Sequence, residues 1–128
     1  MSRDGCAFCD YSGPSYILLT PDAGVIAFAP LVPVTKGHLL VVPLRHVENA
    51  TVDLEVTGRV MTEAARLAQQ MGDCNLITSV GEAATQTVKH LHVHIVPRRI
   101  GDGLALPWTV PNEVRADVDG RALSAERT

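Results

Sequence analysis

The sequence lacks three features that would place the protein in a membrane, in the secretory pathway or on a nucleic acid. No apolar run approaches the roughly 20 residues needed to span a bilayer, and the N-terminal stretch MSRDGCAFCDYSG has no apolar core of a signal peptide. The formal net charge is −3, and the basic side chains form no stripe that would suit a nucleic-acid groove. We therefore expect a cytoplasmic protein with no membrane and no nucleic acid among its partners.

Cysteine is also scarce, with Cys6, Cys9 and Cys74 as the only examples. Three cysteines suit a reducing compartment better than a disulfide scaffold. At 128 residues, 46% of them hydrophobic, the chain has the length of one domain that buries a core without cross-links. We expect this domain to cover residues 1–108, and we expect the polar tail 109–128 to be partly disordered or packed on a partner.

The hydrophobic pattern predicts an α+β fold with five strands and one long helix. From Asp53 to Met71, apolar residues recur every three or four positions, which is typical of a helix with one buried face. Asp53 and Glu55 favour the start of this helix, and Gly72 is suited to its C-cap. Short turns between consecutive strands favour an antiparallel meander. The expected strands are 16–20, 24–30, 38–43, 74–80 and the histidine-rich run that follows the loop 81–87.

Three of the five histidines stand at every second position of KHLHVHIVPRR, residues 89–99. Residues two apart in a strand lie about 6.6 Å from each other on the same face. His90, His92 and His94 should therefore line one face, and the apolar residues between them should point to the other, under the helix. The spacing leaves three interpretations open: a solvated polar face, a metal site, or an imidazole nucleophile whose tautomer is fixed by its neighbours.

A second motif is CAFC, which places Cys6 and Cys9 three positions apart. It does not open a helix after a strand, which is the context of a thioredoxin-like redox pair. By itself it is compatible with a redox pair or with two ordinary thiols. Together with two histidines, the same cysteines would complete a closed four-ligand zinc site.

Two blocks of the sequence resemble the histidine triad (HIT) family. TKGHLLVVPLRHVEN (35–49) resembles the stretch in which a Gly-His pair opens a strand and a Pro-x-Arg-His turn ends it. TQTVKHLHVHIVPRR (85–99) is similar to the phosphate loop and catalytic strand of the branch that includes the fragile histidine triad hydrolases. The resemblance covers about residues 5–108. It implies a nucleotide hydrolase or nucleotidyl transferase that forms a homodimer with a continuous ten-stranded sheet.

The same resemblance implies a role for individual residues. His92 stands where the family attacks the α-phosphorus of a nucleoside phosphoramidate, dinucleoside polyphosphate or related nucleotide, forming a nucleotidyl-histidine intermediate. His94 and His38 match the other histidines of the catalytic site. The positions that match substrate-binding residues are Gln86, Thr87, Thr85 and Ser79. The similarity to bacterial members of the family implies a structural zinc held by Cys6, Cys9, His46 and His90.

Three positions depart from the family pattern. Pro30 replaces an Asp or Asn that contacts ribose hydroxyls, Ser79 replaces an amide, and Thr85 stands where glycine is usual in the phosphate loop. Loss of one hydroxyl acceptor should weaken ribose recognition by about 1 kcal/mol. Two alternatives to a nucleotide hydrolase therefore stay open. One is a nucleotide-binding module with little turnover, and the other is a non-nucleotide metal enzyme that uses the three triad histidines as ligands.

Overall fold

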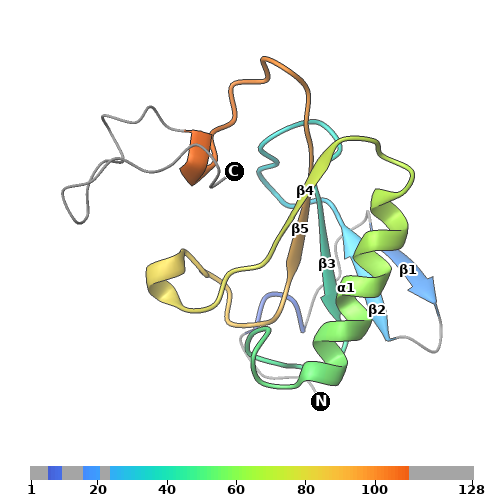
Figure 1. The fold of residues 1–128 in the computed structure, drawn as a ribbon. Coiled ribbons are helices and arrows are strands. Elements are labelled where there is room, and N and C mark those ends of the chain that lie inside the picture. Colours follow the sequence, from blue (N-terminus) through green and yellow to red (C-terminus); the bar gives the residue numbers. More distant parts are fainter. Residues whose placement is uncertain (1–5, 10–15, 21–23, 110–128) are drawn as a thin grey trace.

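The computed structural model describes residues 6–9, 16–20 and 24–109. Within them, five strands form one sheet and one α-helix covers a face of it (Figure 1), which confirms the predicted α+β class. The strands are β1 (Tyr16–Thr20), β2 (Val25–Phe28), β3 (Leu39–Pro43), β4 (Cys74–Ile77) and β5 (Val93–Pro97). The helix is α1 (Leu54–Ala68), and two short 3-10 helices are η1 (Glu82–Ala84) and η2 (Pro107–Thr109). Of the expected tail, residues 110–128 lie outside the described part of the chain.

The strand order is β1-β2-β3-β5-β4, and every pair of neighbours is antiparallel. This order differs from the expected meander, because β5 lies between β3 and β4. Both β3 and β4 run antiparallel to β5, so they are parallel to each other, and the chain crosses between them through α1. Parallel strands need such a crossover. Because of this crossover, β3 and β4 are separated by the width of one strand. The strand β5, which contains the end of the histidine run, lies between them.

Helix α1 begins after Asp53, whose carboxylate accepts a hydrogen bond from the backbone N–H of Val56 at 3.2 Å. This is the usual way in which an aspartate caps a helix N-terminus. The helix ends at Ala68, three residues earlier than predicted. Gly72 follows with a φ of 79°. Since glycine adopts positive φ without steric cost, Gly72 allows the chain to turn into β4 rather than capping the helix directly.

The helix packs on the face of the sheet that carries the apolar residues between the histidines, as the alternation predicted. Leu91, Val93 and Ile95 are buried in one cluster with residues of α1 such as Val60 and Ala64. Each fully buried aliphatic side chain of this size stabilises the fold by about 1.5–3 kcal/mol. None of the helices in the described residues is long and apolar enough to cross a bilayer.

The opposite face of the sheet carries the histidines, and it is not a solvated polar surface. His90 is fully buried and His92 is 7% exposed. A smaller apolar cluster of Ile26, Phe28, Leu40 and Val42 lies on β2 and β3. The strand β5 begins only at Val93, so His90 and His92 lie in the segment just before it. His94 is opposite Leu40 of β3 on one side and Ile77 of β4 on the other.

Candidate active site and metal centre

The ring of His92 is held in one tautomer by its own backbone. Its Nδ1 lies 2.8 Å from the carbonyl oxygen of His90. Because a carbonyl oxygen only accepts hydrogen bonds, Nδ1 must carry the proton and donate it. In the neutral ring, Nε2 therefore keeps its lone pair. An imidazole whose lone pair is fixed in this way can act as a nucleophile.

His38 and His94 form a second pair with fixed protons. The backbone N–H of Val34 donates to Nδ1 of His38 at 3.1 Å, so the proton of the neutral His38 ring is on Nε2. That Nε2 lies 3.0 Å from Nδ1 of His94 and donates to it. The proton of neutral His94 is therefore on its own Nε2. From there it can donate to a phosphate oxygen or to a leaving group.

Burial keeps both of these rings neutral near pH 7. The pKa of His94 is lowered to about 4, mainly by burial and further by the charges that His92 and His38 would carry. Burial also lowers the pKa of His38. A neutral pair is what the hydrogen bonds require, because a protonated His38 would lose the acceptor for the N–H of Val34.

Two cavities adjoin the histidines and share His92, His94 and Thr85 in their linings. The large cavity, of about 650 Å³, lies beside β2 and β3 and has mostly apolar walls that include Pro30. The small cavity, of about 280 Å³, lies beside β4 and β5 and includes Ser79. The paired imidazoles therefore stand between two spaces that can hold the two parts of a substrate.

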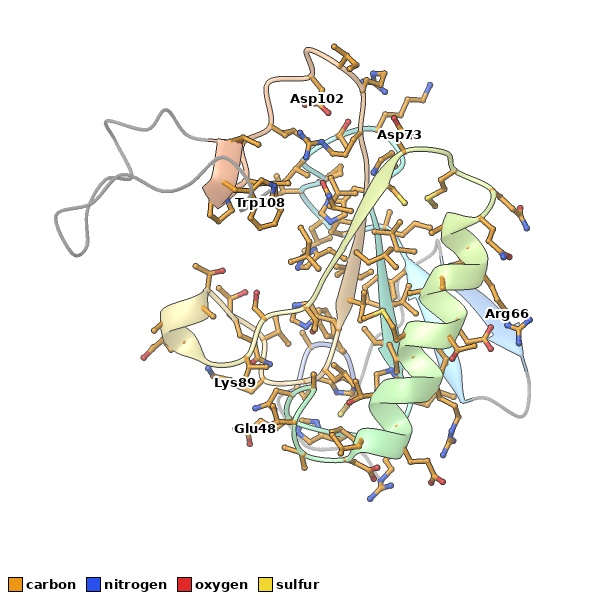
Figure 2. The ribbon with its side chains drawn as sticks, in the orientation of Figure 1. Glu48, Arg66, Asp73, Lys89, Asp102 and Trp108 are labelled. Atoms are coloured by element: carbon orange, nitrogen blue, oxygen red, sulfur yellow. The ribbon has the colours of Figure 1, made fainter. Side chains whose placement is uncertain are left out.

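The loop that begins at Gly81 is organised around Gln86, which is only 3% exposed. The side-chain oxygen of Gln86 accepts from the N–H of Gly81 at 2.9 Å. Its amide nitrogen donates to the carbonyls of Glu48 at 2.8 Å and of Val88 at 3.0 Å. Figure 2 shows Glu48 and Lys89 beside this loop. Gln86 thus positions the loop from inside, with all three of these hydrogen bonds made to backbone groups, whereas the family resemblance placed it among the substrate-binding residues.

The other three predicted substrate-binding residues do face the cavities. Thr85 lines both, Thr87 lines the large one and Ser79 lines the small one. Thr85 has a φ of 69°, in the left-handed region that a β-branched residue rarely adopts. This backbone conformation gives a physical reason for the glycine that the family resemblance implies at this position.

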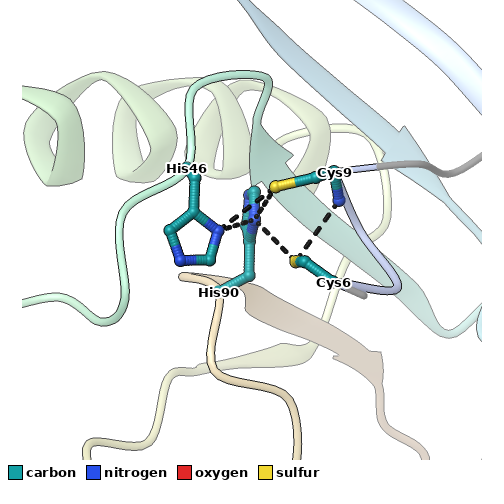
Figure 3. A group of neighbouring side chains, drawn as sticks. All are labelled: Cys6, Cys9, His46 and His90. Atoms are coloured by element: carbon teal, nitrogen blue, oxygen red, sulfur yellow. Dashed lines mark hydrogen bonds between the residues drawn. The ribbon is translucent and has the colours of Figure 1, made fainter. Parts of the chain in front are cut away.

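The four predicted metal ligands converge in one cluster (Figure 3). Their ligand atoms all lie within 4.8 Å of one another. Nδ1 of His90 is 3.3 Å from Sγ of Cys6, 3.4 Å from Sγ of Cys9 and 3.2 Å from Nδ1 of His46. Tetrahedral zinc bound at about 2.3 Å by sulfur and about 2.0–2.1 Å by nitrogen would separate its ligand atoms by about 3.3–3.8 Å. The cluster therefore has the composition and nearly the size of a zinc site.

The second nitrogen of His90 supports this arrangement. Nε2 lies 2.8 Å from the carbonyl oxygen of Pro43 and donates to it, so the lone pair of Nδ1 faces the thiols. Metal-bound histidines are usually oriented by such a bond. Because both nitrogens of His90 are engaged away from His92 and His94, the triad does not form a three-histidine metal site. In the part of the chain that the structure describes, no other group of three or more metal-binding side chains converges in this way.

Two contributors to the site were not identified from the sequence. Val34 acts through its backbone N–H, which no side-chain pattern reveals. Phe8 lines the large cavity with His92 and His94. The sequence did carry one signal for Phe8, which is its position between the two cysteines of CAFC. A metal ion bound by both cysteines would also fix the residue between them.

The model of the HIT domain family matches residues 14–101. The chain belongs to the HIT family. It is 34% identical over 116 residues to the protein named Protein hit from Bacillus subtilis strain 168, a match that covers 82% of this chain and 79% of that protein. Similarity to the fragile histidine triad branch is confirmed by the fusion protein NitFhit of Caenorhabditis elegans. It is 30% identical over 105 residues, which are 77% of this chain and 24% of the fusion protein.

Solved structures of this family share the fold. The HIT family hydrolase from Clostridium thermocellum superimposes with a TM-score of 0.66 at 28% identity, covering 82% of this chain and 100% of that chain. A zinc-bound histidine triad family protein from Mycobacterium smegmatis gives a TM-score of 0.67 at 30% identity, covering 80% and 81%. A relative of similar length therefore binds zinc.

Proposed function

We propose that the protein is a nucleotide hydrolase or nucleotidyl transferase whose nucleophile is His92. The observation that carries the proposal is the hydrogen bond from Nδ1 of His92 to the carbonyl of His90, which leaves the Nε2 lone pair available. The hydrolase named among the HIT structures supports the same reaction class. The substrates we expect are nucleoside phosphoramidates, dinucleoside polyphosphates or related nucleotides.

The reaction would proceed in two displacements. In the first, Nε2 of His92 donates its lone pair to the α-phosphorus, and the bond to the leaving group breaks with its electron pair. His94 donates a hydrogen bond where negative charge develops, and the leaving group takes a proton from water. In the second, water attacks the phosphorus, the bond to His92 breaks and the lone pair returns to Nε2. The proton released by this second water combines with the hydroxide left when the leaving group was protonated. The net reaction therefore consumes one water and yields a nucleoside monophosphate and the protonated leaving group.

A pair of asparagine variants tests the assignment. His92→Asn should bind a nucleoside monophosphate as the parent does but release no product, because binding and attack use different groups. His94→Asn should retain activity reduced by roughly 10²–10³-fold, the usual effect of losing one donor to the transition state. Turnover by His92→Asn at a rate close to that of the parent would refute the proposal.

A nucleotide-binding module with little turnover is the second candidate, because Pro30 gives the large cavity no side-chain acceptor where the family contacts ribose. The same assay separates the two candidates. A parent protein that binds nucleotides tightly but releases no product from phosphoramidates or polyphosphates would favour the binding module.

We also propose that Cys6, Cys9, His46 and His90 hold a structural zinc ion, which the match in ligand distances supports. Four protein ligands close the coordination shell, so the ion would tie the N-terminal segment to the domain rather than activate a substrate. His90 would then serve the metal, while His92 and His94 serve the reaction.

A further inference from the structure

We propose that zinc binding and nucleotide binding strengthen each other, and that Phe8 is the residue that couples them. This inference rests on the proposed function and on the proposed zinc ion, and it goes beyond a purely structural ion. An ion that only stabilises the fold would leave the affinity of the folded domain for nucleotide unchanged. With the coupling, a metal ion held by Cys6 and Cys9 raises the affinity of the large cavity for nucleotide.

Phe8 belongs to the metal cluster by its place in the chain and to the large cavity by its side chain. It stands between Cys6 and Cys9, whose Sγ atoms lie 3.3 Å and 3.4 Å from Nδ1 of His90. Its ring lies in the wall of the large cavity, and the centroid of that ring is 5.1 Å from the centroid of the His92 ring. A shift of the two cysteines therefore moves part of the wall against which we expect the nucleoside to bind.

The strength of the contacts that hold the two cysteines depends on whether a metal ion is bound. Sγ of Cys9 also lies 3.2 Å from Nδ1 of His46, and Figure 3 shows both cysteines reaching the histidines from one turn. Without an ion, such thiol–imidazole contacts are weak hydrogen bonds, because sulfur is a poor donor and acceptor. Zinc would replace them with metal–thiolate and metal–imidazole bonds, which contribute folding free energy directly. Zinc should therefore fix the turn at residues 6–9, and Phe8 with it.

His90, by contrast, is fixed by contacts that need no metal ion. Its Nε2 donates to the carbonyl of Pro43 at 2.8 Å, and the residue is fully buried. The backbone N–H of Leu91 donates to the carbonyl of Val47 at 2.6 Å. These bonds keep the carbonyl of His90 in place, and that carbonyl accepts the hydrogen bond from Nδ1 of His92. Metal occupancy should therefore act on the binding of nucleotide and only slightly on the reactivity of His92.

Thermodynamic linkage makes this coupling reciprocal. If zinc raises the affinity for nucleotide by some factor, a bound nucleotide must raise the affinity for zinc by the same factor. The structural reason is the same in both directions, because a nucleoside that packs against Phe8 would hold the turn that carries the two thiols. Couplings between two sites of one protein are roughly 5–150-fold. We expect about tenfold here, since one aromatic part of a larger apolar wall is affected.

Binding measurements on the full chain test both directions of the linkage without turnover. The probe is adenosine monophosphate, which belongs to the proposed product class. Sucrose is added to stabilise the folded state, and circular dichroism verifies that the zinc-free protein is folded. Calorimetry should give a dissociation constant about tenfold lower for the zinc-loaded protein than for the zinc-free protein. Competition with a zinc-binding dye should show zinc bound about tenfold more tightly when adenosine monophosphate is saturating.

Phe8→Ala separates coupling through the ring from stabilisation of the fold. In this variant both factors should fall to near one, although all four metal ligands are intact. The matched control is Leu31→Ala, because Leu31 lines the same cavity, is fully exposed and lies in the loop after β2. It should keep the tenfold coupling even where it weakens nucleotide binding. Equal factors in Phe8→Ala and the parent would overturn the proposal, because they would show that the ring carries no coupling.

Steady-state kinetics add a readout that a purely structural ion would not change. Removal of zinc should raise KM by about tenfold and leave kcat near that of the zinc-loaded protein. A lower kcat with KM unchanged would overturn the proposal. If the coupling is present but the parent releases no product from any substrate, the coupling stands and the proposed hydrolase function fails. If the parent turns over nucleotides but binds them equally well with and without zinc, the function stands and the coupling fails.

Discussion

The ring of Phe8 contacts the ring of His92 edge to face, with centroids 5.1 Å apart and planes at 77°. Phe8 also contacts Phe28 at a centroid distance of 5.5 Å. It therefore joins the cysteine segment, the apolar cluster of β2 and β3, and the proposed nucleophile. Aromatic pairs of this kind contribute about 0.5–1.5 kcal/mol beyond the burial of their surface. A metal ion bound by Cys6 and Cys9 would therefore also fix the position of Phe8, which forms part of the wall of the large cavity.

Phe8→Ala should weaken binding of a nucleoside monophosphate by about tenfold, because the large cavity loses an aromatic wall worth about 0.5–1.5 kcal/mol in ring contacts. Zinc content should stay at the parent level, since Cys6 and Cys9 are unchanged. Calorimetry and metal analysis on the same preparation measure the two effects. The control is Phe8→Tyr, which keeps the ring. Parent-like affinity in Phe8→Ala would show that the contact has no role in binding.

Cys6→Ser should reduce zinc content and lower the melting temperature, because a ligand of the proposed structural ion is lost. For a domain of this size, each kcal/mol lost lowers the melting temperature by roughly 3–5 °C. Turnover by the protein that remains folded should stay near normal. Cys74→Ser is the matched control, since Cys74 lies in β4 and outside the cluster. A parent that holds no zinc and melts at the same temperature as Cys6→Ser would contradict the proposal.

The low pKa of His94, about 4 in the folded protein, predicts a specific dependence of stability on pH. Imidazole in an unfolded chain has a pKa of about 6.5. Between these values the unfolded chain binds a proton that the folded chain does not. The contribution of His94 to the free energy of unfolding is thus complete above about pH 6.5 and declines as the pH falls toward 4.

Two measurements check this prediction. The ring signals of His94 in NMR spectra should not titrate between about pH 5 and 8, because its pKa lies below that range. His94→Gln should lose less stability than the parent as the pH falls through the same interval. A His94 signal that titrates near pH 6.5 would contradict the prediction, because it would show that the ring is hydrated rather than desolvated by burial.

Thr85→Gly should stabilise the protein by up to about 1 kcal/mol. Left-handed backbone costs a residue with a Cβ roughly 1–2 kcal/mol, and the greater entropy of glycine in the unfolded chain offsets about 0.4–1 kcal/mol of that gain. Thr87→Gly is the control, since among the described non-glycine residues Thr85 alone has a positive φ. Thermal unfolding should show opposite shifts for the two variants. Destabilisation of equal size in both would argue against strain at Thr85.

The protein should be a homodimer in solution, as its family resemblance implies. In the described sheet, β4 has β5 on one side and no strand on the other, so its backbone can pair with a second copy. Sedimentation velocity at micromolar concentration should show a single species of twice the 13.7 kDa chain mass. A species of one chain mass across this range would contradict the expectation.

The sequence by itself determined the elements and the residue types of the site. Period-two and period-3.6 patterns are local, so they predicted the five strands, the long helix and the face on which Leu91, Val93 and Ile95 are buried. The element ends were less accurate, because the helix ends at Ala68 rather than Met71 and β4 ends at Ile77 rather than Val80. The family resemblance that the motifs carry also implied the four residues that converge in the metal cluster.

Only the tertiary structure decided the strand order and the chemical state of each histidine. The place of β5 between β3 and β4 depends on a crossover through α1, which no local pattern encodes. The tautomers of His38, His90 and His92 are set by backbone groups of Val34, Pro43 and His90. Backbone groups are the same in every residue type, so the sequence carries no signal for them until the fold brings them within hydrogen-bonding distance.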